Sequence, residues 1–409
     1  MLMRTRERTL GTALFIAAAF MPLNCSAQSA SGGISDDVIK IGVLGEYGVG
    51  KDLGGPGSVT AAKLAAEDFK NQVLGKPIEI VSADHQGKPD VAVGVAKKWF
   101  DIEHVDAITD LAVSSVGLAV AGLATQSNRS ALISGAATSD LTGANCSPVI
   151  THWADDTYAL SSGIVPEVSA KLGKDWFFVA VDYSFGTAML RDASDTLKKG
   201  GGKVVGSVRY PYGTPDFSSF LLTAQSSGAK VVALASTGAD TINGVKQAHE
   251  FGLQAGGQTI VGLLTFIADI HSVRLKDAQG MYLASQYYWD DDDNTRSFAK
   301  RFFEIEKRMP TKLQAATYAS VKHYLKAIEA SGTDEAKAVN AKMRSMPVDF
   351  FGRKARIRQD GRVIYDLGVY RVKSPSDSKA PWDYYEKIST IPGDKAFRPE
   401  NEGGCALVR

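Results

Sequence analysis

The stretch Ile39–Phe69 reads IKIGVLGEYGVGKDLGGPGSVTAAKLAAEDF, and it decides the fold of this chain. Its first six residues, Ile39–Leu44, contain alternating β-branched side chains, which predicts a buried strand. Glycines recur between Gly45 and Gly57, and Ser58 then stands where a helix N-cap is expected. The residues at the i, i+3, i+4 and i+7 positions of the following helix are Ala62, Ala65, Ala66 and Phe69. A strand, a glycine-rich loop and a helix in this order predict the first unit of an open α/β sheet, in which the loop faces a ligand.

The N-terminal residues have the composition of an export signal. Three arginines lie among the first eight residues, and an apolar run, Leu10–Phe20, follows them. The small residues Ser26 and Ala27 come next, so we expect a signal peptide over 1–27 and a periplasmic mature chain. The apolar run is too short to span a membrane. Cys25 raises the alternative of a lipoprotein, but the residues PLN before it match the usual lipobox poorly, which favours simple cleavage.

Charge and cysteine content narrow the possible partners. Removal of residues 1–27 takes away three arginines and one glutamate, which leaves 43 basic and 44 acidic residues. This balance argues against a nucleic acid or an anionic membrane surface as the partner. Two cysteines then remain, Cys146 and Cys405, and an even number in an oxidising compartment predicts a single disulfide. The alternative is a pair of buried free thiols.

Strand and helix patterns alternate along the chain in two series. The first series is predicted at strands Ile39–Leu44, Ile78–Ala83, Ala107–Thr109 and Ala131–Ser134, with helices Val59–Val73, Val91–Glu103 and Val116–Gln126. After a pause at Cys146–Asp156, the second series is predicted at strands Trp176–Val181, Lys203–Tyr210, Val231–Ala235 and Thr259–Leu264, with helices Tyr158–Leu172, Gly186–Lys199, Phe217–Gln225 and Thr241–Phe251. Strands separated by helices predict parallel sheets, and the repeated layout favours two similar α/β lobes over one large sheet.

From Tyr282 onward the pattern changes. Four aspartates at 290–293 are expected to form a solvated turn at the start of a helix, where acids are favoured. Further helices are predicted at Arg296–Arg308, at Leu313–Ala330 and ahead of Pro347. The alternation over Ala355–Arg371 predicts a hairpin with its turn at Gln359–Gly361. The segment from Ser374 is rich in Pro, Gly and charge, and we expect it to run irregularly over the surface.

Motifs for catalysis, cofactors or metals do not assemble in this sequence. Gly45–Asp52 reads GEYGVGKD, one residue away from a P-loop, but Asp52 stands where Ser or Thr must hold Mg²⁺. A GxSxG nucleophile elbow is missing, and the six histidines lack the spacing of metal ligands. The sequence therefore favours a binding protein over an enzyme, with no cofactor.

Two segments at predicted strand ends have the residues of a carboxylate site. Ser114 and Ser115 precede the helix predicted from Val116, and the run SGAAT at Ser134–Thr138 follows another strand. Small residues, hydroxyls and free N–H groups at the carboxyl ends of strands suit a ligand carboxylate. The alternative for each segment is ordinary helix capping. In the second series, aromatic residues occupy matching positions after strands, at Tyr183, Phe185 and Phe266.

With these segments in place, the chain resembles the periplasmic substrate-binding proteins of ABC transporters, of the leucine/isoleucine/valine-binding type. The resemblance is carried by Ile39–Ser58, Ala112–Ser115, Ile133–Thr142, Val181–Met189, Gly228–Gly252 and Thr317–Thr333. It implies two doubly wound α/β lobes that close on a ligand about a hinge. It also implies three crossovers, near Trp153–Asp155, Ser285–Trp289 and Met346–Phe351. The first lobe would comprise 36–153 and 288–348, the second 154–286 and 352–400, and the C-terminal tail 401–409.

The resemblance also implies roles for individual residues. Ser114, Ala136, Ala137 and Thr138 match the residues that hold a ligand carboxylate, and Phe185 matches an aromatic wall. The further candidate ligand-binding residues are Tyr47, Ser115, Tyr183, Thr265 and Phe266.

One departure from the family pattern concerns the loop Gly262–Phe266. Amino-acid receptors of this type place there an acid for the ligand's ammonium group, but this loop has no acid before Asp269. A buried ammonium without a counter-charge costs several kcal/mol. We therefore expect an organic carboxylate with an aromatic or apolar body, delivered by a monomeric receptor to a permease in the inner membrane. The alternatives are a branched-chain amino acid or amide receptor, and a ligand sensor in place of a transport component.

Overall fold

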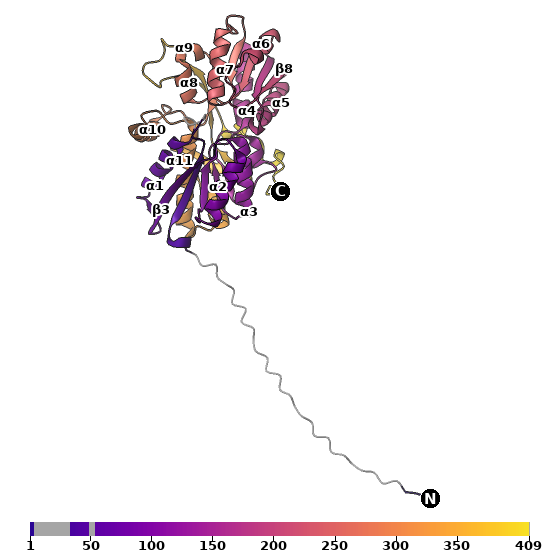
Figure 1. Ribbon diagram of the computed structural model, residues 1–409, viewed down its shortest axis with the longest axis vertical. Coiled ribbons are helices and arrows are strands. Elements are labelled where there is room, and N and C mark those ends of the chain that lie inside the picture. The colour runs from indigo at the N-terminus through magenta and orange to yellow at the C-terminus, as the bar shows by residue number, and fades with distance from the viewer. Residues whose placement is uncertain (4–32, 49–53, 409) are drawn as a thin grey trace. The chain divides into compact units, whose positions relative to one another are not determined.

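The computed structural model describes residues 1–3, 33–48 and 54–408. The predicted signal peptide, including Cys25, lies almost entirely outside the described residues, and so does the segment 49–53 with Asp52. The unit Gly33–Arg409 is described here by itself. It contains two α/β lobes, one carrying α1, α2, α3 and α11 and the other carrying α4 to α9 (Figure 1).

The first lobe is built on a six-stranded sheet in the order β2-β3-β1-β4-β5-β6. Its strands are β1 (Ile39–Gly45), β2 (Gln72–Val73), β3 (Lys76–Asp84), β4 (Ala107–Asp110), β5 (Ser130–Ile133) and β6 (Ile150–His152). Its helices are α1 (Pro56–Glu67), α2 (Pro89–Asp101), α3 (Ser114–Gln126), α10 (Asp293–Glu306), α11 (Lys312–Ser331) and α12 (Ala336–Ser345), with short 3-10 helices at Ser35–Asp37 and Ser139–Thr142. Strand β1 pairs in parallel with β3 and β4, as the sequence predicts.

Side chains of β1 pack into two apolar cores, one on each face of the sheet. Ile41 and Val43 belong to the core that contains α1 and α11, whereas Leu44 belongs to the core of α2 and α3. Burial on both faces is the reason that β1 has a nearly continuous apolar sequence. Gly42 leaves room for α2, because a Cβ atom there would lie 2.5 Å from the ring of Trp99.

The second lobe is built on a four-stranded parallel sheet in the order β10-β9-β7-β8. Its strands are β7 (Asp175–Val181), β8 (Lys203–Tyr210), β9 (Val231–Ala235) and β10 (Thr259–Gly262). Its helices are α4 (Thr157–Leu172), α5 (Ser184–Lys199), α6 (Ser218–Ser226), α7 (Ala239–Glu250), α8 (Ile267–Val273) and α9 (Leu275–Ala278). An antiparallel sheet of three strands, in the order β11-β15-β16, packs on α4 and completes this lobe: β11 (Tyr282–Ser285), β15 (Leu367–Val372) and β16 (Tyr385–Ile391).

The chain passes between the lobes three times. It leaves the first lobe between β6 and α4, and it returns between β11 and α10. The third passage follows a small antiparallel sheet of β12 (Val348–Phe350), β13 (Arg353–Ile357) and β14 (Val363–Ile364), which packs on α11 and α12 before the chain enters β15. The third crossover was predicted near Met346–Phe351, which overlaps β12 at the start of this small sheet.

Three predicted elements are wrong in their extent. The hairpin predicted over Ala355–Arg371 is limited to β13 and β14, because Leu367–Arg371 pairs instead with β11 and β16. The segment after Ser374 is not irregular throughout, since Tyr385–Ile391 is strand β16 and Gly393–Ala396 is helix α13, ahead of a 3-10 helix at Glu400–Glu402. The alternation of side chains identifies a strand but does not name its partner, which here is remote in the sequence.

The first helix also differs from its prediction at both ends. It begins at Pro56, with Gly55 at the N-cap, and Ser58 is buried inside its first turn. The φ angle of proline is fixed near the helical value, which suits the first position of a helix. The helix therefore starts at Pro56 and not after Ser58. The helix ends at Glu67 and not at Val73, because Lys70 and Asn71 adopt a φ of 55° and turn the chain into β2.

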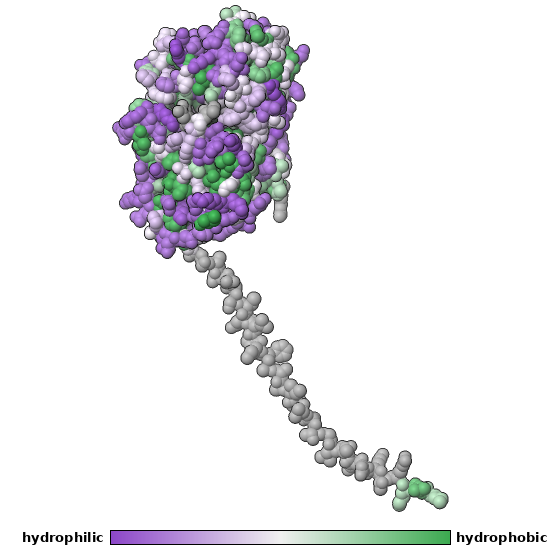
Figure 2. All heavy atoms as spheres, in the orientation of Figure 1, coloured by the Kyte–Doolittle hydropathy of each residue, from purple (hydrophilic) through white to green (hydrophobic). Residues whose placement is uncertain are grey.

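Cys146 and Cys405 are joined by a disulfide with a Cα–Cα distance of 5.6 Å. It ties the C-terminal segment to the loop that precedes β6. None of the helices in the described part of the chain combines the length and hydropathy of a membrane-spanning helix. Hydrophilic residues predominate on the face drawn in Figure 2, and hydrophobic residues appear there in separate patches.

Candidate functional site

The carboxyl end of the first-lobe sheet brings together four of the predicted ligand residues. Ser114 opens α3, and its Oγ accepts hydrogen bonds from the N–H groups of Ala137 (3.3 Å) and Thr138 (3.2 Å), with Ala136 buried beside them. Ser115 follows in the first turn of α3 and is half-buried. The first turn of a helix has N–H groups without partners inside the helix. The Ser114 hydroxyl proton and the N–H groups of the first turn are donors of the kind that a carboxylate takes, and a carboxylate could also replace Ser114 Oγ as the acceptor for Ala137 and Thr138.

Aromatic side chains of the second lobe face this region. Tyr183 caps α5, and the centroid of its ring lies 5.9 Å from that of Phe185 and 5.5 Å from that of Tyr212, which it meets edge-on. Tyr183 packs against the apolar cores of both lobes, including the one between α2 and α3. Tyr183 and Phe185 are therefore together at the lobe interface, whereas Tyr212 was not predicted. It follows β8 by two residues, a position equivalent to that of Tyr183 after β7.

Away from the hinge, two groups of hydrogen bonds between described residues join the lobes. The Tyr212 hydroxyl donates to both carboxylate oxygens of Glu46, at 3.1 Å each. The Ser139 hydroxyl donates to Oδ2 of Asp192 at 2.7 Å, and Arg191 beside it donates to Asp140 at 2.9 Å. The lobes are thus in contact across the cleft, which is the closed arrangement of a hinged receptor.

Two acids at the lobe interface were also not predicted from the sequence as site residues. Glu46 directly follows β1 and is 5% exposed, and Asp240 lies in the first turn of α7 and is 1% exposed. Burial raises the pKa of Asp240 to about 6, and it raises the pKa of Glu46 as well, with the carboxylates of Asp84 and Asp240 adding to the effect. The signal that identifies them is positional, because each follows a predicted parallel strand at its carboxyl end.

Tyr47 lies against its own lobe. Its N–H donates to Asp84 at 3.2 Å, and its ring borders Gly45 and Gly55. Next to it, the fully buried Asp110 accepts a hydrogen bond from the N–H of Gly55 at 3.1 Å. Among the described residues of this loop, Glu46 bonds to the second lobe, whereas its neighbour Tyr47 bonds to its own lobe.

Thr265 and Phe266 lie at the hinge, where they line a small cavity together with Lys312, Tyr288 and Tyr385. The Lys312 ammonium is 5.3 Å from the centre of the Phe266 ring. It donates to Asp155 at 2.9 Å and to the carbonyl of Ala284 at 3.0 Å, and it thereby links the first two crossovers. The cavity has room for about one water molecule.

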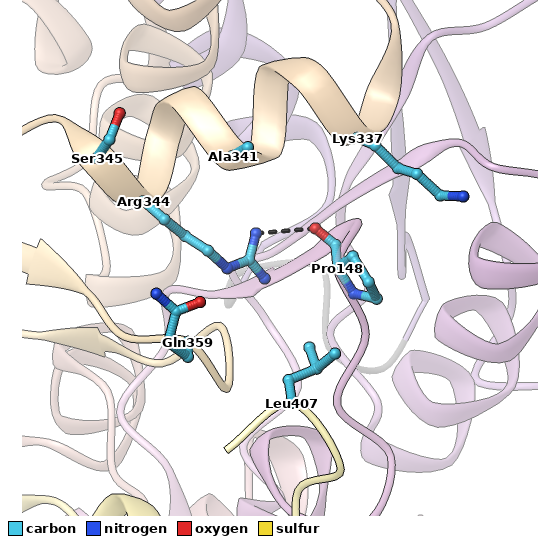
Figure 3. A pocket seen from close by; sticks show the side chains of 7 residues that line it. All are labelled: Pro148, Lys337, Ala341, Arg344, Ser345, Gln359 and Leu407. Atoms are coloured by element: carbon cyan, nitrogen blue, oxygen red, sulfur yellow. Dashed lines mark hydrogen bonds between the residues drawn. The ribbon is translucent and has the colours of Figure 1, made fainter. Parts of the chain in front are cut away.

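A larger hollow lies elsewhere, between α12 and the C-terminal segment (Figure 3). Arg344 extends from α12 into it and donates to the carbonyl oxygen of Pro148 at 2.8 Å, while Gln359 and Leu407 border the hollow (Figure 3). The same guanidinium also donates to the carbonyls of Ser147 and Ile150. We assign Arg344 a structural role, because its donors hold the loop between the disulfide and β6. Within the described ranges, no cluster of three or more His, Cys, Asp or Glu side chains is arranged to hold a metal ion.

Comparison with known proteins agrees with this architecture. A periplasmic binding protein from Burkholderia mallei is 42% identical, with a TM-score of 0.89 over 91% of this chain and 100% of its own. A branched-chain amino acid ABC transporter periplasmic ligand-binding protein from Burkholderia xenovorans is 38% identical, with a TM-score of 0.81 over the same shares. Leu/Ile/Val-binding protein homolog 6 of Brucella melitensis is 26% identical, over 75% of this chain and 80% of its own length. The family model described as periplasmic binding protein matches residues 38–379, and the chain belongs to that family.

Proposed function

We propose that this chain is the receptor of an ABC importer for a small organic carboxylate with an aromatic or apolar body. The observation that carries the proposal is the group formed by Ser114, Ala137 and Thr138, together with Tyr183 of the second lobe, which packs against the apolar core beside that group and contacts Phe185. The donors would hold the carboxylate, and the rings would cover the body of the ligand when the lobes close. The receptor would then present its load to a permease in the inner membrane.

Structures of similar fold support a carboxylate ligand. Solute-binding proteins of ABC transporters from Rhodopseudomonas palustris, 19% and 21% identical to this chain, contain benzoate and 4-hydroxybenzoate respectively. At this identity they share the fold alone. The loop Gly262–Phe266 supports the same choice, because the first acid after it, Asp269, accepts a hydrogen bond from the N–H of Phe266 in a helix cap.

A screen of the purified receptor tests this proposal. Benzoate, 4-hydroxybenzoate, a short keto acid, leucine and a neutral amide are compared by thermal shift and titration calorimetry. We expect a carboxylate to raise the melting temperature by the mass-action relation. A shift with leucine or the amide and none with any of the other carboxylates would contradict the proposal.

The Ser114→Ala variant addresses the donor group itself. Loss of the hydroxyl leaves the N–H groups of Ala137 and Thr138 without their acceptor and removes one ligand donor. We expect the dissociation constant for the bound carboxylate to rise about tenfold. Ser127→Ala is the matched control, because it is the same change at the other end of α3, and we expect it to leave the affinity unchanged. Equal effects of the two variants would argue against Ser114 as a ligand residue.

A branched-chain amino acid receptor is the second candidate. The relative from Burkholderia xenovorans, which is 38% identical, is described as a branched-chain amino acid transporter protein, and this description favours the second candidate. Leucine in the same screen decides between the two candidates. Co-purification with a permease or with a signalling protein separates transport from sensing, since the pocket would be the same in both.

A further inference from the structure

Closure of the two lobes brings carboxylates from opposite sides together. Glu46 comes from the first lobe and Asp240 from the second, and both are almost fully buried. The Tyr212 hydroxyl of the second lobe donates to Glu46, while Oδ2 of Asp240 accepts from the N–H of Gly213, three residues after β8. The loop after β8 therefore touches both acids, and this places them at one point of the interface.

The negative charge at this point is not balanced by the described residues. The charged groups that act on Glu46 are the carboxylates of Asp84 and Asp240. Lys51 lies outside the described residues, so the statement on charge balance does not include it. Oδ1 of Asp240 is buried and has no hydrogen-bond partner among the described residues. A buried carboxylate oxygen without a partner is costly, and two like charges that meet in a desolvated interface add to the cost.

The surrounding side chains suit a cation. The rings of Tyr183 and Tyr212 meet edge-on at 5.5 Å. Burial raises the pKa of both hydroxyls, and the nearby carboxylates of Glu46 and Asp240 add to this effect. Aromatic rings attract cations, most strongly where water is excluded. Because the described residues contain no cluster suited to a metal ion, an organic cation such as an ammonium fits this place better.

The sheet order sets the distance between this point and the carboxylate donors. Glu46 follows β1, whereas Ala137 and Thr138 follow β5, and β4 lies between these two strands. Neighbouring strands are about 4.8 Å apart, so the two points are separated by roughly 10 Å along the edge of the sheet. The α-ammonium and the carboxylate of an amino acid are attached to one carbon, so these two groups are too close together to reach both points.

We propose that the ligand carries a carboxylate at one end and an ammonium group at the other, the ammonium being held between Glu46 and Asp240 against the rings of Tyr183 and Tyr212. This inference rests on the proposed function, because it takes the carboxylate to bind at Ser114 and Thr138. According to this inference, the ligand is an ω-ammonium carboxylic acid and not a carboxylic acid without a cationic group. A ligand cation would neutralise the two carboxylates as the lobes close and would thereby favour closure.

Matched ligand pairs test the inference at pH 7.5 by titration calorimetry on the purified receptor. The pairs are 4-(aminomethyl)benzoate with 4-methylbenzoate, and 6-aminohexanoate with hexanoate. We expect the ammonium-bearing member of at least one pair to bind at least about tenfold more tightly than its neutral partner. Glu46→Gln and Asp240→Asn are each expected to bring this ratio down toward one. Asp182→Asn is the matched control, because this exposed acid follows β7 and is paired with Arg209, and the ratio should not change.

The possible failures of the two proposals are distinguishable. Binding of the neutral acids with equal or higher affinity than the ammonium acids, together with sensitivity to Ser114→Ala, overturns the ammonium site and leaves the carboxylate receptor standing. An affinity ratio that survives both Glu46→Gln and Asp240→Asn overturns the assignment to these two residues. Absence of binding by every carboxylate overturns both the receptor proposal and this inference.

Discussion

At the scale of single residues, Asp110 explains why glycine occupies positions 45 and 54. Its carboxylate is fully buried and accepts a hydrogen bond from the N–H of Gly55. A Cβ atom at Gly54 would lie 2.8 Å from its oxygens, and one at Gly45 would lie 2.9 Å away. Gly55 itself has a φ of +53°, which side-chain-bearing residues rarely adopt. These glycines make room for a carboxylate of the protein.

Replacement of Asp110 by Asn should change how stability depends on pH. Burial raises the pKa of Asp110 to about 7, whereas an unfolded aspartate titrates near 4. The folded chain therefore binds this proton more tightly than the unfolded chain does. The resulting stabilisation is complete below about pH 4 and is lost as the pH rises through about 7. Asparagine keeps an acceptor for Gly55 and does not ionise.

Urea unfolding of both proteins at pH 5 and pH 8 measures this effect. Between these values the wild type should lose about 2–4 kcal/mol of unfolding free energy relative to Asp110→Asn. Burial also raises the pKa of Asp106 to about 7, but that group is present in both proteins and cancels in the comparison. The same pH dependence in both proteins would show that Asp110 is ionised in the folded chain.

At the scale of elements, helix α5 depends on the absence of a side chain at Gly186. The helix starts three residues after β7, and a Cβ atom at Gly186 would lie 1.8 Å from the carbonyl oxygen of Val181. A backbone atom cannot move aside as a flexible side chain can. The close approach fixes the direction of α5 and thereby the positions of Tyr183 and Phe185.

Gly186→Ala should destabilise the second lobe, because either α5 or the end of β7 must shift. We expect a loss of about 3 kcal/mol or more in the free energy of unfolding, measured by chemical denaturation. Gly94→Ala is the matched control, since Gly94 is exposed in α2 and no atom lies within 4 Å of the added Cβ. That change should stabilise the protein by about 0.5–1 kcal/mol. Similar losses for both variants would contradict the packing argument.

The helices and strands could be predicted from the sequence where the local pattern of apolar residues determines them. Periodicity and strand ends located β1, β7 and β9 closely, because these strands are buried on both faces and read as apolar runs. They also located β8, although it is a partly exposed strand at the edge of its sheet. The sequence pattern did not predict the pairing of β15 or the existence of β16. The partners of these strands are remote in the sequence and depend on the route of the chain through the third crossover. Ser114 was predicted from its place at a strand end, whereas Tyr212, two residues after β8, was not predicted.

At the scale of the whole molecule, the hinge contains a buried ion pair. Lys312 and Asp155 are 2% and 1% exposed, and they join α11 to the first crossover. A second bond from Lys312 to the carbonyl of Ala284 reaches β11, at the start of the second crossover. One ammonium group thus connects three segments that meet only in the folded chain.

Replacement of Lys312 by Met should destabilise the protein by about 3–5 kcal/mol, because it leaves Asp155 buried and unpaired. The double variant Asp155→Leu, Lys312→Met removes both charges and should recover most of this loss. Urea unfolding of the three proteins measures the difference. Equal stability of the single and double variants would show that the loss arises from packing at the hinge and not from the unpaired charge.

The sequence by itself determined the α/β class and the two-lobed architecture, because these follow from local periodicity. It also predicted the donor group at Ser114, from residues at strand ends. It also presented Cys146 and Cys405 as a pair, since no other cysteine remains after residue 27. Only the tertiary structure decided which loops face one another across the cleft. Glu46, Asp240 and Tyr212 are far apart in the sequence, and their meeting depends on the order of strands in two separate sheets and on the angle at which the hinge closes them.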